Sequence, residues 1–179
     1  MISKEELLRI MPYAKLRVDT FLSPLNTVLE EYGIVTPLRM AAFLAQLAHE
    51  SGEFRYVEEL ASGQAYEGRK DLGNLEVGDG EKFKGRGLIQ ITGRDNYRKC
   101  SLALFNDERL LETPDLLRAP VYAVECAGWF WDIHHLNGLA DKKDFRGITR
   151  VINGGYNGYA DRVKYYERAL LVLGDTLET

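Results

Sequence analysis

Hydrophobic and polar residues recur with a helical period over most of this chain. Apolar residues return every three or four positions in 3–11 and 18–32, which predicts two amphipathic helices. The same spacing predicts helices over 121–135 and 159–173, the last of them ending at Gly174. These segments together predict a mainly α fold.

A further helix is predicted to begin at Pro37, because Thr36 is a good N-cap and proline costs nothing at the first helical position. On a helical wheel Glu50 falls about 20° from Phe43, at the edge of the apolar face that includes Leu47. A carboxyl group at such an edge loses hydration of its charged form, which raises its pKa and suits it to donate a proton. The wheel alone favours a simpler interpretation, in which Glu50 is a boundary residue at a helix end.

Gly52 is predicted to end this helix and to let the chain turn. Without a break, a glutamate nine residues after Glu50 would face the opposite side, about 13.5 Å along the axis. With a turn, Glu58 or Glu59 can return to face Glu50. Inverting cleavage of a glycosidic bond uses two carboxyl groups about 6.5–9.5 Å apart, one protonating the leaving oxygen and the other activating a water. This stretch can supply both groups, and Glu53 is expected to be solvated.

One strand is predicted, over residues 88–92, within a glycine-rich region that otherwise indicates loops. Ile89 and Ile91 share one face of this strand, while Gln90 and Thr92 share the other. The polar face can therefore point towards a ligand. The neighbouring glycines do not match a phosphate-binding pattern, so this criterion disfavours a nucleotide site.

Composition and charge narrow the classes of function. A chain of 179 residues with 45% hydrophobic residues can bury one core, which predicts a single domain over residues 1–179. The net charge of -4 argues against a nucleic-acid-binding protein, and no apolar run is long enough for a signal peptide or a membrane span. Residues 81–99 carry six basic and two acidic residues, and this local surplus of positive charge could bind carboxylates on a polymer. Cys100 and Cys126 lack CxxC spacing and are predicted to be buried free thiols.

Three segments carry a resemblance to a known family, in order and in spacing. They are AAFLAQLAHESGEFRYVEELASGQAYEGR, GDGEKFKGRGLIQITGRDNY and FRGITRVINGGYNGYADRVKYYERA. They resemble the family 19 glycoside hydrolases, most closely the short phage endolysin and bacterial chitinase-like branch. The likeness runs from about residue 36 to residue 173. It implies a lysozyme-like α+β fold in which a small β-hairpin lines a deep cleft.

The resemblance also implies roles for individual residues. Glu50 is the expected proton donor and Glu59 the expected base, with Glu58 and Glu67 as alternative bases because this segment varies in length across the family. Thr92 is expected to help hold the attacking water. Arg162 is also a candidate partner for the second acid. The expected substrate-binding residues are Gln90, Asn96, Tyr97, Asn153 and Arg162.

Several of these residues have a simpler interpretation. Asn153 before two glycines is, without the resemblance, an ordinary helix stop. Gln90 and Thr92 also fit the wet face of a strand. The adjacent His134 and His135 point about 100° apart on a helix, which makes them poor partners for one ion. We therefore expect no metal site.

The sequence predicts an endolysin-type glycoside hydrolase that cleaves the β-1,4 amino-sugar backbone of bacterial peptidoglycan by inversion, without metal or cofactor. We expect a monomer that binds glycan strands and neither nucleic acid nor membrane. It is expected to stay in the cytoplasm until it is released to the cell wall. A chitinase acting on chitin is the nearest alternative, and a catalytically inactive glycan-binding module is the alternative from another class.

Overall fold

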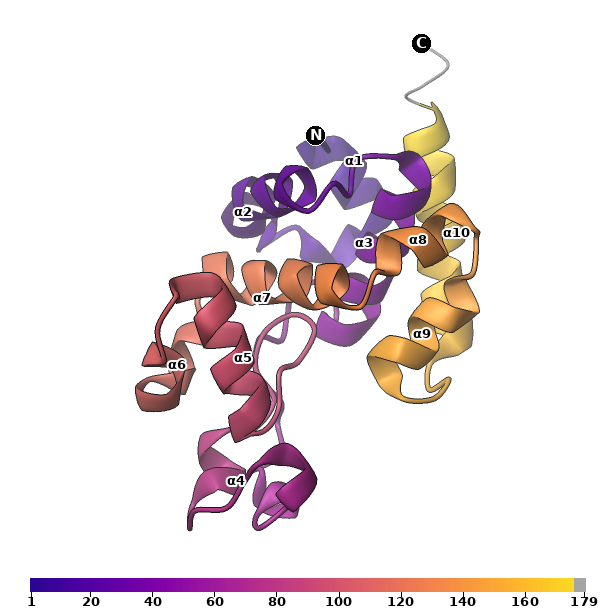
Figure 1. Ribbon diagram of the computed structural model, residues 1–179. Coiled ribbons are helices and arrows are strands. Elements are labelled where there is room, and N and C mark those ends of the chain that lie inside the picture. Colours follow the sequence, from indigo (N-terminus) through magenta and orange to yellow (C-terminus); the bar gives the residue numbers. More distant parts are fainter. Residues whose placement is uncertain (176–179) are drawn as a thin grey trace.

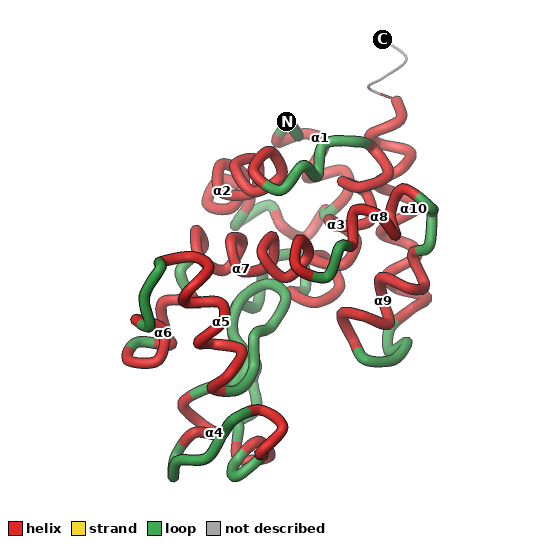
Figure 2. The backbone as a smooth tube through the Cα atoms, viewed as in Figure 1, coloured by secondary structure: helices red, strands yellow, loops and turns green. Residues whose placement is uncertain are grey.

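The computed structural model describes residues 1–175, which fold almost entirely into helices and connecting loops (Figures 1 and 2). The prediction of a mainly α protein is confirmed. The α-helices of these residues are α1 (Lys4–Ile10), α2 (Val18–Glu31), α3 (Pro37–Ser51), α4 (Asp79–Lys82), α5 (Arg94–Phe105), α6 (Arg109–Glu112), α7 (Pro120–Ile133), α8 (Leu136–Asp141), α9 (Phe145–Asn153) and α10 (Tyr159–Asp175). Short 3-10 helices lie at Pro12–Ala14, Gln64–Tyr66, Lys70–Leu72 and Pro114–Arg118.

Local capping explains where the first helices begin. The Ser3 hydroxyl accepts a hydrogen bond from the backbone N–H of Glu6, whose carboxylate accepts one from the Ser3 N–H, a capping box at the start of α1. At the start of α3 the Thr36 hydroxyl accepts from the N–H of Arg39, as predicted. The predicted end of the last helix is wrong, because α10 continues through Gly174 to Asp175.

The predicted β-hairpin is wrong, and no strand is present in residues 1–175. Two isolated bridges, Glu58 with Arg86 and Arg86 with Ile91, are the only β pairing in this range. Arg86 and Ile91 exchange both backbone hydrogen bonds, at 3.2 and 2.8 Å, and so close residues 87–90 into a tight loop. Gly87 makes this loop possible, because its φ of 95° is unfavourable for other residues.

The predicted alternation of side chains in residues 88–92 is nevertheless confirmed. Ile89 and Ile91 are buried, at 2% and 3% exposure, while Gln90 and Thr92 are half-buried. A tight loop with two inward side chains thus produces the same apolar and polar pattern as a strand. The pattern therefore predicted which side chains point inward but not the backbone that carries them.

Two hydrophobic clusters make up the core, and α7 contributes to both. The larger cluster joins α1, α2, α3, α8, α9 and α10, and Trp131 of α7 lies in it. The smaller cluster joins Phe83, Ile91, α5 and α6, and Trp129 and Cys126 of α7 lie in it. Both cysteines are free and buried, as predicted.

Residues 52–93 connect two parts of the structure, and α4 within this segment lies at the lower end of the molecule in the view of Figure 1. α3 and α10 pack along each other on one side of the molecule, and α5 packs on α6 on the other (Figure 1). Long loops and short helical turns connect the end of α3 to the start of α5 (Figure 2). No helix within the described range has the length and apolarity needed to cross a bilayer.

Candidate active site

Glu50 lies in the last turn of α3 and is paired with a buried arginine. Its Oε1 is 2.6 Å from an Nη of Arg162, whose side chain is 1% exposed, whereas the Glu50 side chain is 22% exposed. The predicted location of Glu50 at a partly buried helix end is confirmed. The predicted roles of Arg162 are wrong, because it pairs with Glu50 rather than with a second acid and is too deeply buried to contact a substrate.

A buried chain of hydrogen bonds holds Arg162 in place. Arg162 donates to the Gln46 side-chain oxygen at 2.5 Å and to the Asn157 carbonyl at 3.0 Å. The Gln46 amide donates in turn to the Thr149 hydroxyl, which donates to the carbonyl of Phe145. The chain connects α3, α9 and α10, so three helices fix the position of one guanidinium beside Glu50.

The chain turns sharply after Glu50, as the glycine predicted. Gly52, Glu53 and Phe54 all have positive φ, at 56°, 58° and 70°, so two non-glycine residues adopt a conformation that costs about 1–2 kcal/mol each. The Ser51 hydroxyl stabilises this turn by accepting from the N–H of Phe54. The Phe54 ring, 1% exposed, stacks on Phe21 at 4.7 Å.

Glu53 is buried, so the prediction that it would be solvated is wrong. Only 4% of the residue is exposed, and its carboxylate accepts a hydrogen bond from the Tyr13 N–H. Burial raises the pKa of Glu53, while Tyr13, Tyr165 and Arg168 oppose the shift. Glu53 therefore ties the turn after α3 to α10 and to the N-terminal region.

Glu58 and Glu59, although adjacent, have very different partners. Glu58 lies 2.9 Å from Arg86, 3.2 Å from Lys84 and 3.6 Å from Arg118. Burial opposes ionisation of Glu58, but the hydrogen bonds and charges of Arg86 and Lys84 outweigh it and hold the pKa below its usual value. Glu58 is thus a fixed, charged member of an ion cluster.

The Glu59 carboxylate is held by neutral donors. Its Oε1 accepts from the Gly85 N–H at 2.5 Å, and its Oε2 accepts from the Tyr66 hydroxyl at 3.1 Å. The Lys84 ammonium contacts the backbone carbonyl of Glu59, the carbonyl of Ala61 and the Glu58 carboxylate, and among the described residues it forms no ion pair with the Glu59 carboxylate. These contacts fix the carboxylate in space without a cation on it, an arrangement that suits a group whose task is to accept a proton.

The Glu67 carboxylate is bound by backbone groups of its own loop. Its two oxygens accept from the N–H groups of Gly78 and Gly80, each at 2.9 Å. These bonds lower the pKa of Glu67, which is consistent with a fixed carboxylate. Glu67 closes the loop from residue 67 to residue 80, and this argues against it as the alternative base.

Three predicted residues, Gln90, Thr92 and Asn96, line one pocket of about 150 Å³. The Asn96 amide donates to the Thr92 carbonyl at 2.8 Å, which holds the start of α5 against the loop. Gln90 also lies against Gly85, the residue that binds Glu59: a Cβ added at Gly85 would be 2.7 Å from the Gln90 oxygen. The pocket and Glu59 are therefore neighbours. The other lining residues are Ile91, Lys99, Trp129, Phe130, Ile133 and His134.

Tyr97 and Asn153 both have hydrogen-bond partners within the protein. Tyr97 is fully buried and its hydroxyl donates to the Lys84 carbonyl and accepts from Arg86, so the prediction that it lines a sugar subsite is wrong. Asn153 is half-buried, and its side chain accepts from the N–H of Asn157. Asn153 therefore stabilises the loop before α10, and the Asn157 carbonyl of this loop accepts a hydrogen bond from Arg162. A contact of Asn153 with substrate stays a prediction.

Two residues of this region were missed by the sequence analysis. Arg86 is 6% exposed and joins Glu58, the Lys82 carbonyl and Tyr97. Tyr66 donates to Glu59. The sequence signal was a basic residue between two glycines for Arg86, and an isolated tyrosine in a polar loop for Tyr66. Neither signal specifies its glutamate partner, which lies 28 positions away for Arg86 and 7 for Tyr66, without the fold.

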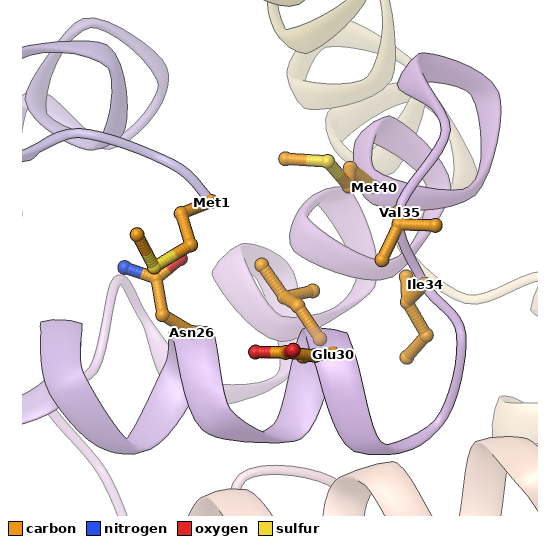
Figure 3. A pocket seen from close by; sticks show the side chains of 7 residues that line it. Met1, Asn26, Glu30, Ile34, Val35 and Met40 are labelled. Atoms are coloured by element: carbon orange, nitrogen blue, oxygen red, sulfur yellow. The ribbon is translucent and has the colours of Figure 1, made fainter.

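A larger hollow, about 360 Å³, lies elsewhere on the molecule (Figure 3). Its lining is mainly apolar and comes from Met1, the second half of α2, the loop between α2 and α3, and the first turn of α3, with Glu30 as its acidic residue. Met40 lies in the first turn of α3, about 15 Å along the helix axis from Glu50. This hollow therefore belongs to the opposite end of α3 and is separate from the candidate site.

Metal-ligating side chains do not gather in the described residues. No group of three or more His, Cys, Asp or Glu residues within 1–175 is arranged to hold a metal ion. His134 instead packs its ring edge against Phe130, with the centroids 4.2 Å apart.

Comparison with known proteins gives consistent matches over most of the chain. Residues 36–140 match the family model described as chitinase class I. A glycosyl hydrolase family 19 domain-containing protein of Haemophilus influenzae is 34% identical, with 96% of each chain covered. An endochitinase of Arabidopsis thaliana is 38% identical over 80% of this chain, which spans only 51% of that plant protein.

Solved structures show the same fold. A bacterial family 19 chitinase matches with a TM-score of 0.77 and 24% identity, covering 97% of this chain and 95% of that one. Chitinase C from Streptomyces griseus HUT6037 matches with a TM-score of 0.76 and 23% identity, covering 97% and 76%. At these identities the likeness establishes the fold alone, and it confirms the predicted lysozyme-like architecture apart from the hairpin.

Proposed function

The chain belongs to glycoside hydrolase family 19, and on that premise we propose that it cleaves the β-1,4-linked amino-sugar backbone of bacterial peptidoglycan by inversion. As a member of this family it is a hydrolase, homologous to endochitinases, that acts on a polysaccharide. The resemblance of residues 36–173 to the short phage endolysin and bacterial chitinase-like branch is the reason for proposing peptidoglycan as the polymer. In this proposal the enzyme is made in the cytoplasm and reaches the wall when the cell is opened.

The different partners of the acidic residues carry the proposal for the mechanism. A base must stay ionised, keep a fixed position and remain able to take a proton. Glu59 fits this role by its contacts, because within the described residues neutral N–H and O–H groups hold its carboxylate in place. Glu58 is bound by three cations and Glu67 closes a loop, which leaves Glu59 as the base.

In the proposed reaction Glu50 donates a proton to the glycosidic oxygen while the bond from C1 to that oxygen breaks. A water attacks C1 from the opposite face, and Glu59 takes one of its protons, so the product has the inverted configuration. The Thr92 hydroxyl, beside Gln90 in the pocket next to Glu59, orients this water. Arg162 fixes the Glu50 side chain through one of its two carboxyl oxygens, so that the carboxyl does not have to be ordered when substrate binds.

The test measures reducing ends released from purified peptidoglycan by the parent and by Glu50→Gln, Glu59→Gln and Glu58→Gln. We expect the first two variants to lose about 10²–10⁴ in kcat, the range for removal of a general acid or base. Glu58→Gln is expected to keep most of the activity and to be less stable. Proton NMR of the first product formed should show the α-anomer; a Glu59→Gln variant that stays active would overturn the assignment of the base.

Chitin is the competing substrate, because several relatives are named endochitinases. The same preparation is therefore compared on soluble chitin oligomers and on peptidoglycan. Cleavage of both polymers would support the proposed catalytic residues and add chitin to the substrates. Activity on chitin alone would contradict peptidoglycan as the substrate. Mass spectrometry of the wall fragments then identifies the sugar that bears the new reducing end.

A further inference from the structure

The pocket lined by Gln90, Thr92 and Asn96 has a charge pattern that the proposed reaction does not use. Neither aspartate nor glutamate is among its lining residues, although the chain as a whole is acidic. Lys99 is an exposed lining residue one turn after Asn96 on α5, and no ion pair of Lys99 occurs within the described part of the chain. The nearest acid in sequence, Asp95, lies 3.8 Å from Arg98 instead.

Lys99 supplies the full positive charge of this pocket at neutral pH. The other basic residue in the lining, His134, is packed edge-on against Phe130. Burial and the neighbouring His135 lower the pKa of His134, so its ring is neutral at pH 7. Within the described residues the Lys99 ammonium group thus has no carboxylate partner, and it shares the pocket lining with the aromatic residues Trp129 and Phe130.

The rest of the lining has the chemistry of a sugar subsite. Trp129 and Phe130 offer flat apolar surface, while the amides of Gln90 and Asn96 offer hydrogen-bond donors and acceptors. A neutral sugar needs nothing more. The unpaired cation is therefore the feature that distinguishes this pocket from one built for an uncharged polymer.

We propose that Lys99 binds a carboxylate carried by the substituent of the sugar held in this pocket, and so selects an anionic glycan over a neutral one. This inference rests on the proposed function. The amino sugars of chitin carry no charge, whereas every second sugar of peptidoglycan carries a lactyl ether whose peptide ends in carboxylates. Because Lys99 is solvent-exposed, the ion pair is screened, and its loss should cost about twofold to fivefold in kcat/KM.

The test uses two forms of one polymer, so that the glycan backbone is the same in both. One is purified peptidoglycan with its peptide carboxylates free, and the other is the same material with those carboxylates converted to amides. The parent, Lys99→Gln and Lys99→Glu are compared by the ratio of kcat/KM on the free form to kcat/KM on the amidated form. Lys142→Gln, which removes an exposed lysine just after α8, is the matched control.

We expect the parent and the control to share a ratio above one, Lys99→Gln to bring the ratio to about one, and Lys99→Glu to reverse the preference. Raising the salt concentration should lower the ratio of the parent and leave that of Lys99→Gln constant. A Lys99→Gln ratio equal to that of the parent, with both substrates still cleaved, would overturn the role of Lys99 alone. Failure of the parent to release reducing ends from either form would instead reject the proposed function on which the inference rests.

Discussion

At the scale of single residues, Glu58 and Glu59 show how partners assign different roles to adjacent carboxylates. In an extended segment successive side chains point to opposite sides. Glu58 therefore meets Arg86, Lys84 and Arg118, while Glu59 meets the Gly85 N–H and Tyr66. The different partners of these two neighbours thus follow from which face of the chain each occupies.

The hydrogen bond from Tyr66 to Glu59 leads to a prediction. Replacing Tyr66→Phe removes the donor but keeps the ring, so Glu59 loses one of its two fixing contacts. We expect kcat to fall about tenfold with KM little changed, since a hydrogen bond to a charged group contributes about 1.5–3 kcal/mol when fully formed and Tyr66 is only partly buried. Steady-state kinetics on soluble glycan would measure this. A Tyr66→Phe variant with the kcat of the parent would show that Gly85 alone holds the carboxylate.

A second residue-scale prediction concerns Glu125 on α7. Burial raises its pKa above the ordinary 4.5, the nearby Glu31 adds to the shift, and the Tyr32 hydroxyl, which donates to Glu125 at 3.1 Å, opposes it. The native state therefore holds this proton to a higher pH than the unfolded state. Its contribution to stability is fully present below about pH 4.5 and is lost as pH rises through the raised pKa.

Glu125→Gln should remove this loss, because the amide is neutral at every pH and its oxygen still accepts from Tyr32. The variant is expected to be more stable than the parent at pH 7.5, by about 1 kcal/mol, and to lose that advantage at pH 4.5. Urea unfolding at the two pH values measures the difference. Glu112→Gln on the exposed face of α6 is the control, and an equal gain in stability there would show that net charge rather than burial is responsible.

At the scale of elements, the crossing of α2 and α7 depends on a glycine. A Cβ added at Gly128 would lie 2.5 Å from a Val28 methyl carbon and 2.6 Å from the Tyr32 ring. Gly138 in α8, by contrast, has no atom within 4 Å of such a Cβ. The two helical glycines therefore differ only in whether a neighbouring helix occupies the space.

The pair gives a matched test. Gly138→Ala should stabilise the protein by about 0.5–1 kcal/mol, because alanine loses less backbone entropy in a helix. Gly128→Ala has the same advantage but forces α2 and α7 apart, and we expect a net loss of about 1–3 kcal/mol. Thermal or urea unfolding of both variants measures the two signs. Stabilisation by Gly128→Ala would indicate that the contact between the helices is looser than the structure shows.

Helix positions and the partly buried Glu50 could be predicted from sequence because their causes are local. The Thr36 cap, the proline after it and the glycine at the end of α3 all act within a few residues. The pairing of Glu50 with Arg162 could not, because the two residues are more than a hundred positions apart and no local pattern links them. The strand predicted over residues 88–92 was wrong for a different reason, because a buried tight loop and a strand can share one pattern of inward and outward side chains.

At the scale of the whole molecule, the proposed acid Glu50 and the proposed base Glu59 belong to parts of the structure built on different hydrophobic clusters. Glu50 is held by α9 and α10 through Arg162, and Glu59 by the loop around Gly85 that packs near Phe83 and Ile91. The chain between them passes through the left-handed turn at Gly52–Phe54, which Glu53 fastens to α10. The relative position of the two carboxyls is thus set by that turn and by α7.

The sharing of α7 between both clusters determines how the protein can open to solvent. Because side chains of α7 are buried in both clusters, α7 cannot unfold without disrupting both of them. The central amides of α7 should therefore exchange their hydrogens for deuterium only through global unfolding. Amides of the exposed turns at residues 64–72 should instead exchange through local opening. Hydrogen–deuterium exchange followed by mass spectrometry in increasing urea measures this. The slowest peptide is expected to come from residues 123–131; faster exchange there than in α5 would mean that the two halves unfold one after the other. If α7 is the slowest segment, a protease could cut within this helix only after the whole protein unfolds, so the first cut in the folded protein is expected in the turns at residues 64–72.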